Sequence, residues 1–346
     1  MLIHARAPLR LGLAGGGTDI SPYCDVYGGY VLNATIDRYA YAVLRPLPES
    51  AGNIRFCATD QQCEEFYNIS TPVSVDAVGT LKLHKAVYNY MMLQYNDGKN
   101  IPLELQTYCD VPIGSGLGSS STLVVAMIKA FVEYMNLPMD DYAIAKLAFQ
   151  IERLDCGLQG GRQDQYSATF GGINFIEFYA NNHVIVNSLR VKNWILCELE
   201  ISLLLFYTGV SRESAGIIKM QQENLNAGNE KTLAAMHAMK DEAIFLKESL
   251  LRGDFNRFTA SMQHGWENKK SSASSVSNPD IEKIYTAAIR AGALAGKISG
   301  AGGGGFMLFF VPVESRINVV RALSQFHGEV SSCHFTKHGA QAWRLD

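Results

Sequence analysis

The most informative part of this 346-residue chain is the stretch PIGSGLGSSS, residues 112–121. It lies between residues 101–111, which are rich in β-forming side chains, and residues 119–135, where apolar side chains recur at helical spacing. Glycines let backbone N–H groups turn toward a ligand, and the start of a helix adds unpaired donors and partial positive charge. Since capping this helix would need one serine and no run of glycines, we expect the loop to bind phosphate.

Two other nucleotide-binding motifs do not fit this loop. A Walker loop requires Gly-Lys-Ser/Thr, and residues 112–121 contain no lysine. A dinucleotide-binding fold places an acidic residue about 20 positions further on, at the end of a strand. The nearest acidic candidate, Glu133, lies within the helical pattern instead. The sequence therefore argues against both a P-loop NTPase and a dinucleotide fold.

Two more glycine-rich loops lie before and after it in the chain. The first, AGGGTD at residues 14–19, follows a strand-like stretch whose polar face carries Arg6 and Arg10. The last, at residues 299–305, satisfies GxGxxG, but a strand starting at Phe306 follows it, whereas the dinucleotide fingerprint requires a helix. Its glycines exceed what a turn needs, so we expect the backbone to approach a ligand or another loop closely.

The composition favours an ordinary folded protein. Hydrophobic residues make up 47% of the chain and charged residues 18%, which suits a real core and argues against disorder. With a net charge of -3, the chain lacks the excess of basic residues that is typical of nucleic-acid binders. The seven cysteines are scattered and form no metal or redox motif. No apolar run approaches the ~18 residues of a membrane span, and arginines interrupt the N-terminal stretch where a signal peptide would be apolar. We expect a cytoplasmic protein without a membrane or nucleic-acid partner.

Strand and helix signals alternate irregularly, which predicts an α+β fold rather than a doubly wound sheet. Two domains are expected, residues 1–190 and 191–346, because polar residues around 179–193 indicate a surface hairpin and a boundary. The predicted strands are residues 3–13, 30–44, 101–111, 172–178, 201–210 and 306–311. The predicted helices are residues 119–135, 140–154, 212–226, 231–251, 255–268 and 280–291, with a serine-rich loop at 271–279 and a final helix and strand at the end.

In this order the three loops resemble the three motifs of the GHMP kinases, the family of galactokinase and of homoserine, mevalonate and phosphomevalonate kinases. The resemblance covers essentially the whole chain and implies a two-domain fold with the active site between the domains. It implies ATP and Mg²⁺ as cofactors and assigns the ATP phosphates to the middle loop. The contacts expected there are Pro112, Gly114, Ser115, Gly116, Leu117, Gly118, Ser119 and Ser120.

The same resemblance assigns the catalytic residues. Asp164, in GGRQDQ, becomes the catalytic carboxylate, close to Arg10, and Ser120 and Glu152 become the Mg²⁺ ligands. The residues themselves also favour Glu152, since it lies at the edge of a helical apolar face, where a carboxylate is costly to bury unless it is paired or metal-bound. Whether Asp164 accepts the proton of the substrate hydroxyl or only orients that hydroxyl stays open.

Substrate contacts are expected from the first and last loops, at Gly16, Gly17, Thr18, Asp19 and Gly302. Galactokinases carry Glu-His where this chain has two glycines, at positions 16 and 17. The form GGGTD, together with GGRQDQYSATFGG and the terminal KHGAQAWRLD, instead resembles the D-glycero-D-manno-heptose 7-phosphate kinase branch of the family. That branch phosphorylates the anomeric hydroxyl on the route to nucleotide-activated heptose.

A substrate that carries a remote phosphate needs a cationic partner, and Arg212 and Lys297 are the candidates. The expected partner is a small-molecule sugar phosphate, and both a monomer and a homodimer are possible. Two alternatives remain: another sugar-1-kinase, acting on fucose or galactose, and a non-catalytic sugar and ATP sensor on the same fold. Because the candidate catalytic aspartate and both candidate metal ligands are present, catalysis is favoured over sensing.

Overall fold

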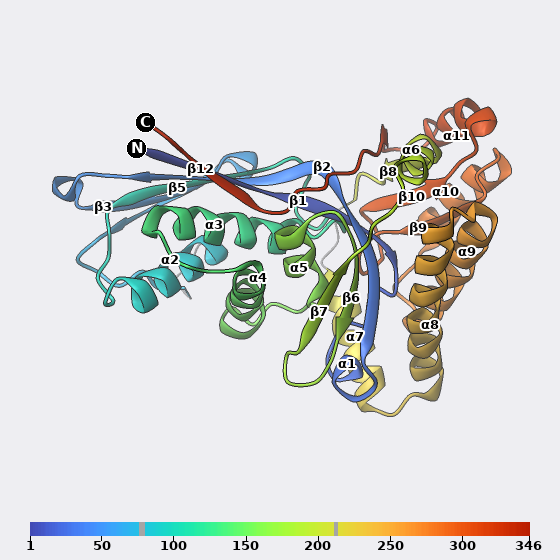
Figure 1. Cartoon of the computed structure of the whole chain (residues 1–346), viewed down its shortest axis with the longest axis horizontal. Helices are drawn as coiled ribbons and strands as arrows, with labels where there is room; N and C mark the ends of the chain where they lie inside the picture. Colours follow the sequence, from blue (N-terminus) through green and yellow to red (C-terminus); the bar gives the residue numbers. More distant parts are fainter. Residues whose placement is uncertain (76–79, 211–213) are drawn as a thin grey trace.

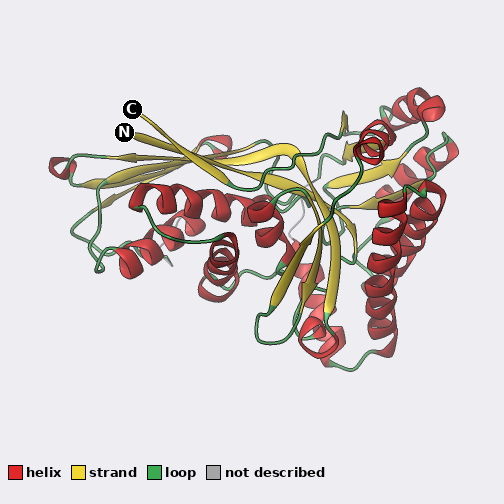
Figure 2. Cartoon of the chain, viewed as in Figure 1, coloured by secondary structure: helices red, strands yellow, loops and turns green. Residues whose placement is uncertain are grey.

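A computed structural model describes residues 1–75, 80–210 and 214–346 of the chain. Its strands form two sheets, and helices cover each sheet (Figures 1 and 2). This arrangement confirms the predicted α+β class, with helices and mainly antiparallel strands mixed along the chain. Within the described residues, no helix combines the length and the apolar character that crossing a membrane would require.

The larger sheet has eight strands in the order β12-β1-β2-β5-β3-β4, with β6 paired to β2 and β7 paired to β6. Its strands are β1 (Leu2–Ala14), β2 (Gly29–Pro46), β3 (Asn53–Ala58), β4 (Cys63–Asn68), β5 (Leu103–Cys109), β6 (Ile173–Phe178), β7 (Val184–Ser188) and β12 (Gln341–Leu345). The long strand β2 pairs with β5 toward its end and with β6 toward its start. It thereby joins the two wings of the sheet that Figure 1 shows.

The helices of the first half lie against one face of this sheet (Figure 1). They are α2 (Lys82–Tyr95), α3 (Ser119–Met135), α4 (Asp141–Phe149) and α5 (Gln163–Phe170). The short helix α1 (Tyr23–Tyr27) lies apart from them and contacts β2. Helix α3 has the predicted bounds, and α4 begins after Asp140, whose side chain accepts a hydrogen bond of 2.8 Å from the N–H of Ala143. A π-helical continuation, η3 (Gln150–Asp155), follows α4 and carries Glu152.

The smaller sheet is antiparallel, with the strand order β11-β8-β10-β9. It contains β8 (Leu203–Tyr207), β9 (Ala295–Ile298), β10 (Phe306–Phe310) and β11 (Glu329–Ser332). Its helices are α6 (Asn193–Ser202), α7 (Ser214–Asn226), α8 (Glu230–Arg252), α9 (Phe255–Ser272), α10 (Pro279–Arg290) and α11 (Arg316–Leu323). The long helices α8 and α9 lie side by side at the edge of the molecule (Figure 1).

In two places a helix extends beyond a predicted boundary, for the same physical reason. The strand predicted from residue 201 starts at Leu203, because Ile195 and Leu199 are buried one helical turn apart and extend helix α6 as far as Ser202. Helix α9 continues past residue 268, because Lys269 and Ser272 are also buried on its inner face. In both places tertiary packing extends a helix into a segment with weak local helical signal.

The last strand returns to the first sheet. β12 pairs antiparallel with β1, with Leu345 opposite Leu2, so the two chain ends lie together (Figure 1). The division into domains at residue 190 stays a prediction. Any boundary placed there must leave residues 341–345 with the larger sheet.

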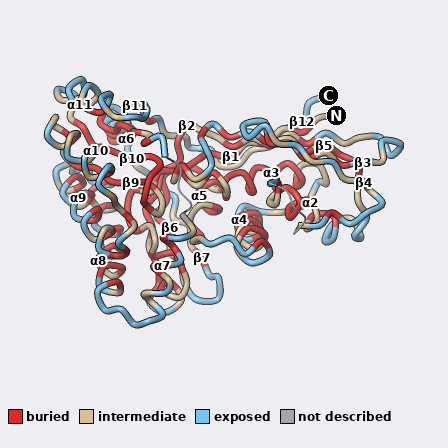
Figure 3. The backbone as a smooth tube through the Cα atoms, turned by 180° about the vertical axis from the view of Figure 1, so that it is seen from behind, coloured by how far each residue is buried: buried red, intermediate tan, exposed pale blue. Residues whose placement is uncertain are grey.

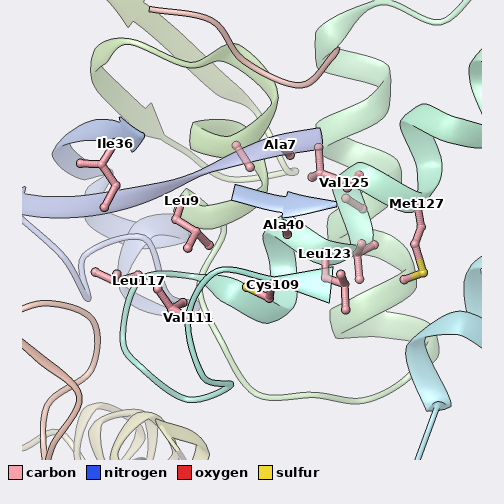
Figure 4. Close-up of a cluster of buried hydrophobic side chains, with 14 of the residues drawn as sticks. Ala7, Leu9, Ile36, Ala40, Cys109, Val111, Leu117, Leu123, Val125 and Met127 are labelled. Carbon is pink, nitrogen blue, oxygen red and sulfur yellow. The ribbon is translucent and has the colours of Figure 1, made fainter. Parts of the chain in front are cut away.

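The main core lies between the larger sheet and its helices, as the buried segments in Figure 3 show. The alternating side chains of β1 are buried as the period of two predicts. Figure 4 shows Leu9 of β1, Ala40 of β2 and Leu123 of α3 in this core. Leu117 lies among them and is fully buried, so a residue inside the middle glycine loop anchors that loop to the core.

Candidate active site

The three glycine-rich loops meet at one cavity of about 550 Å³. Its walls come from the first loop, the middle loop with the start of α3, the segment 157–164, and helices α7 and α9. The expected residues that line it are Arg10, Gly16, Gly17, Asp19, Gly114, Gly116, Gly118, Ser119, Ser120, Glu152 and Asp164. Segments from both halves of the chain therefore surround a single space.

The middle loop leaves the start of α3 open for a ligand. Gly114, Gly116 and Gly118 all have positive φ, between 74° and 82°, which the loop needs in order to curl around the helix N-terminus. No side chain caps α3: Gly118 is the N-cap residue, and the serines that follow do not satisfy the first backbone N–H groups. These free donors and the helix dipole suit an anion such as phosphate.

Three residues expected to contact ATP do not line the cavity, and two of them hold the loop in place. Leu117 is in the core and its carbonyl accepts a hydrogen bond of 3.2 Å from the N–H of Arg10. The carbonyl of Ser115 accepts a 2.9 Å hydrogen bond from the N–H of Phe306. Pro112 also does not line the cavity. These residues position the backbone donors of their neighbours.

The last glycine loop packs directly against the middle loop. A Cβ atom on Gly116 would lie 2.5 Å from the carbonyl oxygen of Ser299, and one on Gly300 would lie 2.7 Å from the carbonyl oxygen of Gly116. The glycines thus permit the close approach between loops that the sequence predicts. Gly302, expected to contact substrate, does not line the cavity, and a Cβ there would lie 2.7 Å from the carbonyl oxygen of Val276.

Asp164 and Arg10 form an ion pair beside the middle loop. Asp164 is in the first turn of α5, and its Oδ1 lies 2.7 Å from Nε and 2.6 Å from Nη2 of Arg10. Nη1 of Arg10 donates to the carbonyl of Gly116 at 2.9 Å and to Oγ of Ser299 at 3.2 Å. A Cβ on Gly118 would lie only 3.0 Å from Cγ of Asp164, so the carboxylate lies directly against the middle loop.

Ser120 and Glu152 lie together as the metal prediction requires. Oγ of Ser120 donates to Oε1 of Glu152 at 2.7 Å, and Nε2 of Gln165 donates to Oε2 at 2.7 Å. Glu152 has no solvent-exposed surface, yet it lies in the wall of the cavity. A hydroxyl and a carboxylate are hard oxygen donors that fit Mg²⁺. The described residues contain no cluster of three or more His, Cys, Asp or Glu side chains suited to a metal, so phosphate oxygens and water would complete such a site.

The first loop contributes a buried carboxylate. Asp19 accepts hydrogen bonds from the N–H of Gly17 at 3.1 Å and from the N–H of Gln163 at 3.0 Å. Burial raises the pKa of Asp19, the bond from Gln163 opposes this, and the nearby charge of Asp164 raises it further. Thr18 does not line the cavity; its hydroxyl lies 2.8 Å from the carbonyl oxygen of Gly15 and holds the loop in shape.

The structure tests one of the two candidate partners for a remote phosphate. Arg212 lies outside the described residues. Lys297, on β9, donates a 2.8 Å hydrogen bond to the carbonyl of Leu13 and does not line the cavity. Its amine supports the first loop, and the geometry gives no support to a contact with substrate.

The cavity wall also contains residues that sequence reasoning missed, among them Arg153, Gln163 and Lys269. Gln163 directly precedes Asp164, so its position next to the candidate catalytic residue was a usable signal. Arg153 follows Glu152 and donates to Oγ of Ser121 at 3.1 Å. Lys269 has no local signal, since it sits at the end of α9, far from any of the three loops in sequence.

Comparisons with known proteins agree with this geometry. The family models GHMP kinases N terminal domain and GHMP kinases C terminal match residues 82–172 and 246–329. A D-glycero-alpha-D-manno-heptose 7-phosphate kinase of Campylobacter jejuni is 48% identical over 343 residues, which is 99% of each protein. A crystal structure of a D-glycero-D-manno-heptose 1-phosphate kinase from Bacteroides thetaiotaomicron is 41% identical, with a TM-score of 0.82 over 99% of both chains.

More distant relatives extend the likeness. An L-fucokinase/L-fucose-1-P guanylyltransferase of Bacteroides fragilis is 26% identical over 88% of this chain and 34% of its own length. A galactokinase of Lactococcus lactis, solved with galactose, is 16% identical with a TM-score of 0.77, a likeness of fold alone. The loops, the ion pair beside them and these matches lead to one conclusion. The chain belongs to the GHMP kinase family and is an ATP-dependent kinase.

Proposed function

We propose that this sugar kinase transfers the γ-phosphoryl group of ATP to the anomeric hydroxyl of D-glycero-D-manno-heptose 7-phosphate. The product would be the 1,7-bisphosphate, a precursor of nucleotide-activated heptose. The observation that carries the proposal is the 48% identity, over 99% of both chains, to a heptose 7-phosphate kinase. The names of the two close relatives differ in the phosphate position, 7 in one and 1 in the other, and our assignment follows the first.

The cavity supports the same chemistry. Phosphoryl transfer depends mainly on positioning and on neutralising the charge of the transferred group. The open N-terminus of α3 and the middle loop supply backbone donors for the phosphates, and Arg10 adds a positive charge beside Gly116. Gly16 and Gly17 leave the sugar side of the cavity without bulky side chains, which suits a substrate larger than a hexose.

Asp164 would act on the sugar hydroxyl. In the proposed step the anomeric oxygen bonds to the γ-phosphorus, the bond from that phosphorus to the bridging oxygen breaks, and ADP leaves with the electron pair. The hydroxyl proton passes to the Asp164 carboxylate or, if that residue only orients the hydroxyl, to solvent. The ion pair with Arg10 holds this carboxylate beside the middle loop, as either role requires.

Ser120 and Glu152 would hold Mg²⁺, and Asp19 would bind sugar hydroxyls. Bound Mg²⁺ would neutralise part of the phosphate charge. The two Mg²⁺ candidates already lie within hydrogen-bond distance of each other, next to the loop expected to hold the phosphates. Asp19 lies on the same wall as Gly16 and Gly17.

Product analysis tests the proposal. Purified enzyme, ATP, Mg²⁺ and heptose 7-phosphate should give a product whose new phosphorus NMR resonance couples to the anomeric proton. A new phosphate on another carbon would contradict the proposed position. Release of ADP and inorganic phosphate without a phosphorylated sugar would contradict the proposed acceptor.

A further inference from the structure

Lys269 is a buried cation that the roles described above leave unused. It lies near the end of α9, its side chain lines the cavity, and only 5% of the residue is exposed. Its ammonium donates to the carbonyl of Gly300, in the glycine loop that packs against Gly116. Among the described residues no carboxylate lies within ion-pairing distance of this ammonium, and a buried charge with one neutral acceptor is costly.

Arg10 cannot by itself neutralise a transferred phosphoryl group. Two of its guanidinium nitrogens bind Asp164, and the third binds the carbonyl of Gly116 and the hydroxyl of Ser299. These four contacts leave a single N–H of the guanidinium for a ligand. Asp164 balances much of the charge of Arg10, so a further cation, in addition to the proposed Mg²⁺, would stabilise the negative charge that develops on the transferred group.

We propose that Lys269 is a further catalytic residue, whose ammonium binds the oxygens of the transferring γ-phosphoryl group. Its anchor, Gly300, abuts the phosphate-binding loop, which places the amine on the phosphate side of the cavity. The inference rests on the proposed function only in taking ATP as the phosphoryl donor. Lys269 neither gains nor loses a covalent bond; its charge offsets that of the γ-phosphoryl oxygens while the β–γ bridge breaks.

The charges around Lys269 suit a site that binds an anion. The pKa of Lys269 is lowered to about 7, mainly by burial and also by the positive charges of Lys297 and Arg10, while the charges of Asp19 and Glu242 oppose the shift. Glu242, buried on α8, has a pKa raised by burial to about 7. A bound phosphate dianion would supply the negative charge that these neighbours do not.

Nucleotide binding to the intact enzyme tests the inference without any sugar. In the presence of Mg²⁺, Lys269→Met should weaken binding of a non-hydrolysable ATP analogue by about tenfold or more and change ADP affinity by less than about twofold. Lys269→Arg should restore most of the difference. The matched control is Lys270→Met, the next residue on α9, which pairs with Glu267 and Glu282 outside the cavity wall. Equal affinity of parent and Lys269→Met for the ATP analogue, or equal loss of ATP analogue and ADP, would overturn the inference.

Turnover supplies the second arm. Lys269→Met should lower kcat by about 10²-fold with little change in the KM of the sugar phosphate. A rise in that KM alone would assign Lys269 to the sugar phosphate and overturn the inference. If Lys269→Met fails to fold because Glu242 loses a neighbouring charge, Lys269→Met with Glu242→Gln replaces it in both arms. If heptose 7-phosphate is not the substrate, the parent enzyme will not phosphorylate it. If Lys269 does not bind the γ-phosphoryl group, Lys269→Met will bind the ATP analogue as tightly as the parent does.

Discussion

At the scale of single residues, two side-chain pairs lie around one cavity: Arg10 with Asp164, and Ser120 with Glu152. The family resemblance predicts all four, and the place of Glu152 at the edge of a helical apolar face supports that residue independently. Lys269 could not be predicted, since nothing near it in sequence distinguishes it from the neighbouring Lys270. Its position depends on how α9 packs against the last glycine loop, which is a tertiary property.

Asp164→Asn should lower turnover by roughly 10²–10⁴, the usual range for a lost general base. The substitution preserves shape and deletes the charge. Affinity for the ATP analogue should stay near the parent value, because backbone donors of the middle loop make the expected phosphate contacts. Steady-state kinetics and calorimetric binding check the two halves, with circular dichroism to establish folding. Parent-like turnover in folded protein would remove Asp164 from the mechanism.

Ser120→Ala and Glu152→Gln should each raise the Mg²⁺ concentration needed for half-maximal rate, because Mg²⁺ in such sites is held by few protein oxygens. Titration of the rate with Mg²⁺ at saturating ATP measures the effect. Ser249→Ala is the control, since that helical serine only donates to the carbonyl of Phe245 in α8. Superimposable titrations of the two site variants and the control would show that the metal ligands are assigned wrongly.

Binding of the ATP analogue at pH 8 should take up protons through Lys269. Its pKa of about 7 makes the amine mostly neutral in the free enzyme at that pH, and a bound anion raises the pKa, so the amine becomes protonated. At pH 6 the amine is already charged and the uptake should be smaller. Calorimetry in buffers of different ionisation enthalpy measures the proton number, and Lys269→Met should abolish the uptake at pH 8. Undiminished uptake in that variant would assign the proton to another group.

At the scale of elements, local patterns were enough where packing agrees with them. The glycine run, the apolar spacing and the absence of any rival signal predict α3 with its observed bounds. The sequence pattern did not predict helix α6 or the C-terminal end of α9, because tertiary burial rather than local sequence extends them. The glycines predicted close approach to a ligand or loop, but sequence could not say that the two glycine loops would contact each other.

Gly116→Ala should disturb ATP binding more than an equally strained glycine substitution elsewhere. Its φ is +82° and the added Cβ would lie 2.5 Å from the carbonyl oxygen of Ser299, so the two loops would have to separate. Gly98 has a φ of +71° and open space around it, so Gly98→Ala incurs only the backbone strain of about 1–2 kcal/mol. The KM for ATP should rise about tenfold in the first variant and stay unchanged in the second. Equal KM values would contradict the role given to loop contact.

At the scale of the whole molecule, one cavity is built from segments far apart in the chain. The first loop follows β1, the middle loop precedes α3, and the last loop joins β9 to β10. The order of these loops was readable from sequence, and so was the fold class. The return of β12 to β1 was not, since a short terminal strand carries no signal for its partner.

The central claim is that the acceptor is a heptose 7-phosphate rather than a free hexose. The most direct measurement is kcat/KM for heptose 7-phosphate, free heptose and galactose, each with ATP and Mg²⁺ under the same conditions. Heptose 7-phosphate should be preferred by about 10²-fold or more, because binding energy from the remote phosphate positions the reacting hydroxyl. Comparable kcat/KM values for galactose and heptose 7-phosphate would contradict it.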